Sequence, residues 1–197
     1  MLKPATFGAV ALVFLAHAAQ SQEAPIGGPR AEVSFSNDTL EARYIDSGRR
    51  VDMAERSRVS AAFFLSEERD IVLNGDLMFP VELGWDRLDV AIGPRAYAAL
   101  LDDENDDVLA LSVGAEVRFV LDRNSRLAVA GQAFYSPDIL TFGSADNLTD
   151  LSARLEMGVG PRVTLFGGMR WFEFDLTEGQ GERTLMEEVF IGVGYTF

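Results

Sequence analysis

EEVFIGVGYTF, residues 187–197, has an apolar side chain at every second position, and this pattern decides the fold. Successive side chains of a β-strand point to opposite faces, so a period of two places these residues on one face. They are Val189, Ile191, Val193, Tyr195 and Phe197. Chain termini are usually poorly ordered unless a sheet holds them. The stretch therefore predicts a paired strand whose outward face contacts an apolar solvent.

The same alternation recurs in two longer runs. Residues 109–121 alternate apolar side chains with a polar face that includes Glu116 and Arg118, and residues 149–159 do the same with Arg154 and Glu156. Strands in soluble sheets usually have about five or six residues. These runs are roughly twice that length, which is what a tilted strand needs to cross a membrane.

Less regular alternating runs supply the remaining strands. They occupy residues 39–45, 57–66, 69–79, 87–101, 125–135 and 162–174. The stretch EVSFSNDTLEARY, residues 32–44, predicts a hairpin about Asn37-Asp38 that pairs Phe35 with Leu40 and Val33 with Ala42. Because single-chain bacterial barrels have an even number of strands, we expect ten strands, with eight as the alternative. The predicted fold is an all-β, transmembrane, antiparallel up-and-down β-barrel.

The connections between these runs differ in length. DRNS at 122–125 and GPR at 160–162 are tight turns, whereas DDENDD at 102–107, SPDILTFGSADN at 136–147 and LTEGQGE at 176–182 are longer. Short turns on one rim and long loops on the other are typical of bacterial outer-membrane barrels. The pattern predicts that the long loops are extracellular and that both termini are periplasmic.

The N-terminal segment has the features of a secretory signal. It contains one early positive charge at Lys3, an apolar run over 7–16 and the small-x-small triplet Ala16-His17-Ala18. The run is too short to span a bilayer as a helix. We predict a signal peptide at residues 1–18, cleaved as late as residue 21 in the alternative, then a short N-terminal segment at 19–30 and the barrel at 31–197.

Composition excludes several classes of function. The chain has no cysteine, and its only lysine and only histidine lie in the predicted signal peptide. A Ser-His hydrolase and a His-ligated metal site are therefore excluded in the mature chain. The formal net charge of −14 argues against nucleic acid as a partner. No cofactor and no metal are expected.

Charged side chains on the inward faces are candidates for a network in the lumen, the interior of the barrel. They are Arg95, Glu116, Arg118, Arg154, Glu156, Arg170 and Glu188. Charges in a confined interior need partners, so pairs of arginine and carboxylate across neighbouring strands are expected. A structural ion-pair core is the favoured interpretation, and a polar pore or solute site is the alternative.

Two further features remain. The acidic run of Asp102, Asp103, Glu104, Asp106 and Asp107 is interpreted as a solvated loop, with a cation-binding loop as the alternative, because it lacks the spacing of a calcium loop. Aromatic residues gather near strand ends and are interpreted as interface girdles. They are Trp85, Tyr97, Phe134, Tyr135, Trp171, Phe172, Phe174, Tyr195 and Phe197.

Several stretches carry a resemblance to a known family. They are EVSFSND at 32–38, GPRAYAALLDDENDDVLALSVGAEVRF at 93–119, AFYSPDILTFGSADNLTDLSARLE at 133–156, PRVTLFGGMRWFEFDL at 161–176 and FIGVGYTF at 190–197. With them the chain resembles the YfaZ family of predicted outer-membrane proteins, and the most specific element is Tyr135-Ser136-Pro137-Asp138. The resemblance implies an outer-membrane β-barrel and no particular activity. The ending with Val193, Tyr195 and Phe197 resembles the signal that the barrel assembly machinery recognises.

These observations give three functional hypotheses. The first is an integral barrel in the outer membrane of a Gram-negative bacterium with a structural, surface-interaction or weak channel role. A small porin for small solutes is the second, and a membrane-embedded enzyme without histidine is the third. The expected partners are outer-membrane lipid, lipopolysaccharide and the barrel assembly machinery, and the expected state is a monomer.

Overall fold

The computed structural model describes residues 28–47, 57–66, 70–100, 107–124, 126–176 and 181–197. These residues form eleven strands and one 3-10 turn, η2 (Asp138–Leu140). The strands are β1 (Arg30–Phe35), β2 (Thr39–Ser47), β3 (Arg58–Ser66), β4 (Ile71–Val81), β5 (Leu88–Leu100), β6 (Val108–Asp122), β7 (Leu127–Ser136), β8 (Thr141–Gly143), β9 (Ala145–Gly158), β10 (Val163–Leu176) and β11 (Gly181–Thr196). No described helix is long and apolar enough to cross a membrane.

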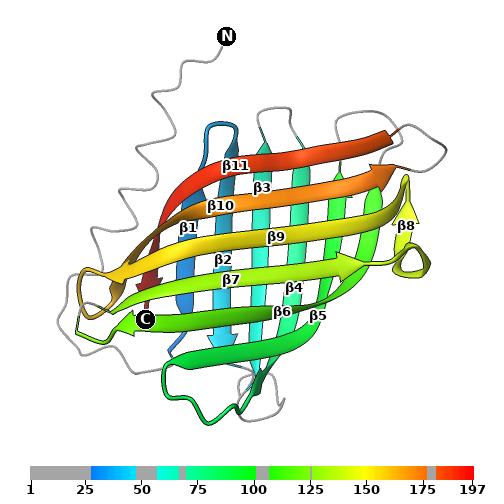
Figure 1. Ribbon diagram of the computed structural model, residues 1–197. Coiled ribbons are helices and arrows are strands. Elements are labelled where there is room, and N and C mark those ends of the chain that lie inside the picture. The colour runs from blue at the N-terminus through cyan, green and yellow to red at the C-terminus, as the bar shows by residue number, and fades with distance from the viewer. Residues whose placement is uncertain (1–27, 48–56, 67–69, 101–106, 125, 177–180) are drawn as a thin grey trace.

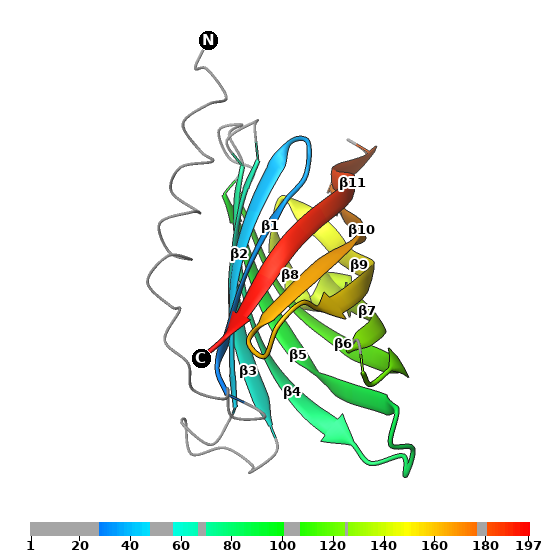
Figure 2. The same cartoon turned by 90° about the vertical axis from the view of Figure 1, so that its left-hand side faces the viewer.

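Ten of the strands close into a barrel. Each pairs antiparallel with its neighbours in the chain, β7 pairs with β9, and β1 pairs with β11 to complete the ring. Strands β1 to β4 form the back wall in Figure 1, and β6, β7, β9, β10 and β11 cross in front of them at a steep angle. Strand β5 curves from the lower front edge into the back wall and so joins the two, and Figure 2 shows both walls from the side. The short β8 pairs only with the start of β6. The predicted ten-stranded antiparallel barrel is therefore confirmed, and the eight-stranded alternative is wrong.

The hairpin at the start of the barrel has the predicted register. Phe35 lies opposite Leu40 and Val33 opposite Ala42. The turn is fixed locally, because the backbone N–H of Thr39 donates to Ser36 Oγ at 2.9 Å and the backbone N–H of Ser36 donates to the Thr39 carbonyl at 3.0 Å. Asn37 and Asp38 suit such a turn because their side chains tolerate its backbone conformations.

The two ends of the barrel differ. We call the end that holds Arg30 and Thr196 the termini end, and the end that holds the turn at 37–38 the far end. The connection from β7 to β9 lies at the far end, as predicted. The short turns after β6 and β9 lie at the termini end, also as predicted. Three other connections do not follow the division into short turns and long loops. Asn37-Asp38 and the link between Ser66 and Ile71 are short but lie at the far end, and the long link between Ser47 and Arg58 belongs to the termini end.

The outer wall is an apolar belt. Every second side chain of β6 from Leu109 to Leu121 points outward, and on β11 Val189 and Ile191 are 72% and 68% exposed. Monomeric soluble proteins rarely expose apolar patches of this extent. An outward apolar band around a closed sheet is the feature by which a barrel contacts lipid.

The aromatic residues divide between this belt and the lumen. Trp85, Tyr135, Trp171 and Phe197 are exposed, as the girdle interpretation requires. For Tyr97, Phe134, Phe172 and Phe174 that interpretation is wrong, since all four are buried inside the barrel. The alternation along β5, β7 and β10 places them on the inward face, where they fill space between the polar groups.

Candidate functional site

The far end of the lumen is filled by apolar side chains. We call this cluster the apolar plug; its buried residues are Ala62, Phe64, Val72, Tyr97, Ala99, Val108, Ala110, Ala145, Leu148, Phe172 and Phe174. The ring of Phe172 packs against Tyr97 and Phe174, with centroid separations of 5.6 and 5.1 Å. Aromatic pairs at such distances are favourable in tilted and edge-on arrangements. The plug therefore fills this end of the lumen with a packed apolar core.

A layer of ion pairs lies beneath the plug, centred on Arg95. The side chain of Arg95 is 0% exposed. Its Nε and Nη2 donate to Asp76 Oδ2 at 3.1 and 2.8 Å, and its Nη1 donates to Asp150 Oδ2 at 3.2 Å. Nη2 also lies 3.2 Å from both Glu116 Oε1 and Gln132 Oε1. Because these partners come from β4, β6, β7 and β9, one guanidinium links both walls of the barrel.

Asp150 joins a second arginine to this layer. Arg170 donates to both oxygens of Asp150, from Nε at 2.9 Å and from Nη2 at 2.7 Å, and Tyr97 donates its hydroxyl to Asp150 at 2.7 Å. Such two-pronged pairs are the strongest arginine–carboxylate contacts. We call Asp76, Arg95, Asp150 and Arg170 the ion-pair layer. It fills the middle of the lumen with charge that is already compensated.

Two arginines also lie against aromatic rings that cover glycines. Arg95 Cζ is 3.6 Å from the centroid of the Phe134 ring, and Arg154 Cζ is 4.7 Å from that of Phe166. A Cβ added to Gly114 would lie 2.4 Å from Phe134, and one added to Gly192 would lie 2.4 Å from Phe166. Only glycine leaves room for each ring to pack against the barrel wall, where its other face contacts the guanidinium of an arginine.

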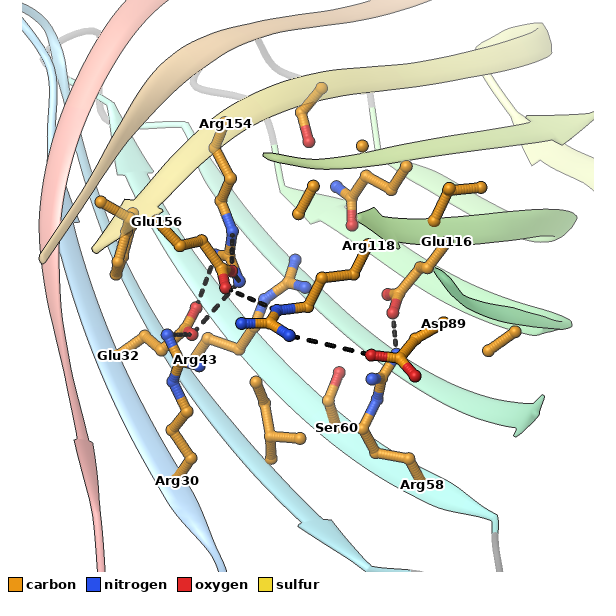
Figure 3. Close-up of a pocket in the computed structure, with 18 of the residues that line it drawn as sticks. Arg30, Glu32, Arg43, Arg58, Ser60, Asp89, Glu116, Arg118, Arg154 and Glu156 are labelled. Carbon is orange, nitrogen blue, oxygen red and sulfur yellow. Dashed lines mark hydrogen bonds and ion pairs between the residues drawn. The ribbon is translucent and has the colours of Figure 1, made fainter. Parts of the chain in front are cut away.

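The termini end of the lumen contains a cavity of about 430 Å³ (Figure 3). Its charged lining consists of Arg30, Arg43, Arg58, Arg118, Arg154 and Arg170 together with Glu32, Glu41, Asp89, Glu116 and Glu156. The mouth is solvent-accessible, since Arg58, Arg118 and Asp89 have 42%, 38% and 76% of their side-chain surface exposed. The cavity thus opens at the termini end, whereas apolar side chains fill the far end.

Carboxylates in the cavity wall are shared between arginines. Glu32 contacts Arg30 at 2.7 Å and Arg154 at 2.8 Å, and Glu156 contacts Arg154 at 2.7 Å and Arg118 at 2.9 Å. Figure 3 shows the Arg118 guanidinium between Glu156 and Asp89. The wall is a continuous network rather than a set of isolated pairs.

The structure brings together most of the charged residues singled out from the sequence. Arg95, Glu116 and Arg170 belong to or contact the ion-pair layer, and Arg118, Arg154 and Glu156 lie in the cavity wall. Glu188 differs from the expected pairing with arginine. It accepts hydrogen bonds from the hydroxyls of Ser36 and Thr39, because it lies level with the first hairpin turn.

Sequence reasoning missed other members of the network. They are Arg30, Glu32, Glu41, Arg43, Arg58, Asp76, Asp89 and Asp150. In β4 the inward face mixes Val72 and Met78 with Asn74 and Asp76, so alternation of polarity is hard to read there. The signal that could have found Asp76 is its spacing of two from Asn74 on the same face.

The remaining candidates lie at the two rims. Val193 pairs with Val33 and Leu165, Tyr195 Oη accepts from Arg162 Nη1 at 3.2 Å, and the backbone N–H of Phe197 donates to the Pro29 carbonyl at 2.9 Å. Of the acidic loop, Asp107 is exposed just before β6, and Asp102, Asp103, Glu104 and Asp106 lie outside the described residues. Within the described part, no group of three His, Cys, Asp or Glu residues is placed to hold a metal ion.

Comparisons with known proteins agree with the fold. The model of a family described as YfaZ precursor matches residues 15–197, and no curated protein sequence matches. A bacterial polysaccharide outer membrane secretin aligns over 83% of this chain at 13% identity and a TM-score of 0.52, and the chain spans 57% of its length. KdgM porin in complex with disordered oligogalacturonate aligns over 86% of this chain and 99% of its own at 10% identity and a TM-score of 0.46. Omp33 of Acinetobacter baumannii aligns over 86% and 98% at 11% identity and a TM-score of 0.40. At these identities the likeness is one of fold alone.

Proposed function

Because this chain belongs to the YfaZ family and folds as a closed barrel with an apolar outer belt, we propose that it is an integral outer-membrane protein of a Gram-negative bacterium whose barrel is closed to solutes. Its termini end faces the periplasm and its far end faces the cell exterior, as in single-chain bacterial barrels whose two termini lie in the periplasm. Its role is structural or lies in surface interaction rather than in transport.

The observation that carries this proposal is the complete burial of Arg95. A guanidinium that contacts Asp76, Asp150 and Glu116 at once occupies the centre of the lumen. Above it the apolar plug excludes water, and an ion entering such a dry region would lose its hydration without compensation. The apolar plug and the ion-pair layer are therefore two barriers of different chemistry, one after the other along the barrel axis.

Two partners are part of the proposal. The acidic run at 102–107 would contact lipopolysaccharide, with divalent cations between its carboxylates and lipid phosphates. The barrel assembly machinery would recognise β11 through its terminal aromatic residues. We also propose that the protein acts as a monomer. Its ten strands already close the sheet, so no open strand edge is left for a second copy to pair with.

Planar bilayer recording tests the closed barrel. Purified protein is inserted into a bilayer and its insertion is verified by heat-modifiable migration on gels. The expected result is the absence of stable conductance steps. Reproducible steps of uniform size would overturn the proposal in favour of the small porin.

Comparison of outer-membrane lipids by mass spectrometry, with and without the protein, tests the remaining enzyme alternative, and unchanged lipids are expected.

A further inference from the structure

The cavity at the termini end has a surplus of hydrogen-bond donors. Both oxygens of Glu32, Glu41, Glu116 and Glu156 already lie within hydrogen-bond or ion-pair distance of an arginine. A guanidinium carries five N–H donors, whereas a carboxylate has two oxygens. Because six arginines and five carboxylates line the cavity, N–H donors outnumber carboxylate oxygens in its wall.

Arg43 shows this surplus most clearly. Its side chain is 10% exposed, so it is nine-tenths buried. Only its Nε is bonded, to Glu41 Oε1 at 3.1 Å; Nη1 and Nη2 have no partner among the described residues. Arg58 behaves similarly nearer the mouth, where Glu116 is its one described partner. Neither Nη atom of Arg43 is among the fully buried unpaired atoms, and both Arg43 and Arg58 line the cavity. Their unused donors therefore face the open cavity, where an acceptor can reach them.

The charge of the cavity wall is balanced, although the protein as a whole is acidic. Apart from Arg170, which Asp150 already compensates, five arginines and five carboxylates line the cavity in a protein of net charge −14. The cavity volume of about 430 Å³ lies in the range of small-molecule sites. Arginine forks match the planar or tetrahedral oxygens of carboxylates and phosphates.

We propose that the cavity binds a small oxyanion, a solute that bears carboxylate or phosphate groups, through Arg43 and Arg58. The ligand enters from the termini end and stops at the ion-pair layer, which has no unused arginine of this kind. This inference goes beyond the closed barrel. It requires only the cavity, so the presence or absence of conductance does not bear on it.

Calorimetric titration of the refolded full chain in uncharged detergent tests the proposal. The probes are citrate and inorganic phosphate, with glucose as the neutral control. We expect citrate or phosphate to bind and glucose not to bind. The substitution Arg43→Met should weaken binding by about tenfold to a hundredfold, the usual worth of hydrogen bonds to a charged group. Arg43→Lys should retain part of it, because it keeps the charge and loses the fork.

The matched control is Arg123→Met, which removes the same charge from an exposed turn outside the cavity. It should bind like the unmodified protein. If Arg43→Met does not fold, Arg58→Met at the mouth replaces it, with the same expected direction. A folded barrel that binds neither anion, or binds them equally well without these arginines, would overturn the site. Equal weakening by Arg123→Met would also overturn it, since attraction would then depend on overall charge.

Discussion

A guanidinium that is completely buried needs several acceptors around it. Arg95 meets this condition through carboxylates on three other strands, and removal of one member of such a set leaves charge without compensation. The carboxylates most affected are Asp76 and Asp150, whose side chains are 1% and 0% exposed.

Arg95→Met should therefore destabilise the barrel by about 3–5 kcal/mol. The free energy of unfolding is measured by urea titration in lipid vesicles. The double variant that adds Asp76→Asn should recover part of the loss, because it removes one of the uncompensated charges. A loss below about 1 kcal/mol in the single variant would contradict the central role of Arg95.

Asn74 presents the opposite case. It is 5% exposed, and neither its Nδ2 nor its Oδ1 has a partner among the described residues. It lies opposite Ala62 and Tyr97, next to the apolar plug. Replacement of unbonded polar atoms by apolar atoms of similar volume removes a desolvation cost. Asn74→Leu should thus raise the free energy of unfolding by about 1–2 kcal/mol. A decrease would indicate that lumen water bonds to the amide.

At the scale of single residues, the sequence predicts which face of the sheet a side chain occupies, but not the residue with which it pairs. Alternation placed Arg154 and Glu156 on the inward face, and the structure agrees. It could not show that Glu32, more than a hundred residues earlier, would bind Arg154, because closure of β1 on β11 creates that contact. Glu188 accepts hydrogen bonds from the hydroxyls of Ser36 and Thr39 because the turn of the first hairpin lies at the same level along the barrel axis.

Among the elements, β10 and β11 depend on a glycine. A Cβ at position 192 would lie 2.4 Å from Phe166 Cζ and 2.7 Å from the Val33 carbonyl oxygen. Gly192→Ala should destabilise the barrel by about 1–3 kcal/mol, the usual cost of overpacking. Gly75→Ala is the control, because its Cβ would lie at an ordinary 3.5 Å from the Ser60 carbonyl oxygen. Equal effects of the two substitutions in urea titration would contradict the close approach.

Strand β11 carries a second prediction, about assembly. Phe197 packs edge-on against Tyr195 at 5.2 Å, and its side chain is exposed. Phe197→Ser, or a polar tail after Phe197, should lower the amount of folded barrel in the outer membrane more than it lowers stability. Heat-modifiable migration of membrane fractions measures assembly, and urea titration of refolded protein measures stability. Val189→Ser, on the same face of β11, is the control and should assemble normally.

The strand pattern was readable where one face is purely apolar, as in β6 and β9. It failed just after β7, where 136–147 was expected to be one long loop. There Ser136 Oγ donates to the Leu111 carbonyl at 3.0 Å, η2 interrupts the strand, and β8 then resumes along β6. Gly143 ends β8 with φ 101°, a conformation that favours glycine. Side-chain bonds to a neighbouring strand leave no periodic signal in the sequence.

For the whole molecule, closure of the pore is predicted to depend on two layers. Phe172→Ala with Phe174→Ala opens the apolar plug but leaves Arg95 and Asp150 in place, so bilayer recordings should still show no steps. Addition of Arg95→Ala removes both barriers, and steps should appear. Trp171→Ala, which changes an exposed ring, is the control. Conductance in the double variant alone would show that the ion-pair layer is no barrier.

This layering could not be read from the sequence. Alternation tells which face a residue occupies, but not its depth along the barrel axis. Phe172 and Arg170 are both inward-facing residues of β10, yet one belongs to the apolar plug and the other to the ion-pair layer. Depth follows from the stagger of neighbouring strands, which the pairing of all ten strands determines together.

The first strand, β1, is short compared with the other strands of the barrel wall. β1 has six residues, whereas β6 has fifteen. At about 3.4 Å per residue and a tilt of about 45°, six residues cover about 14 Å along the membrane normal, against about 25 Å for the usual apolar band. We therefore expect the lipid beside β1 to compress to match the protein. The barrel should locally thin the bilayer at the junction of its first and last strands and prefer membranes with shorter acyl chains.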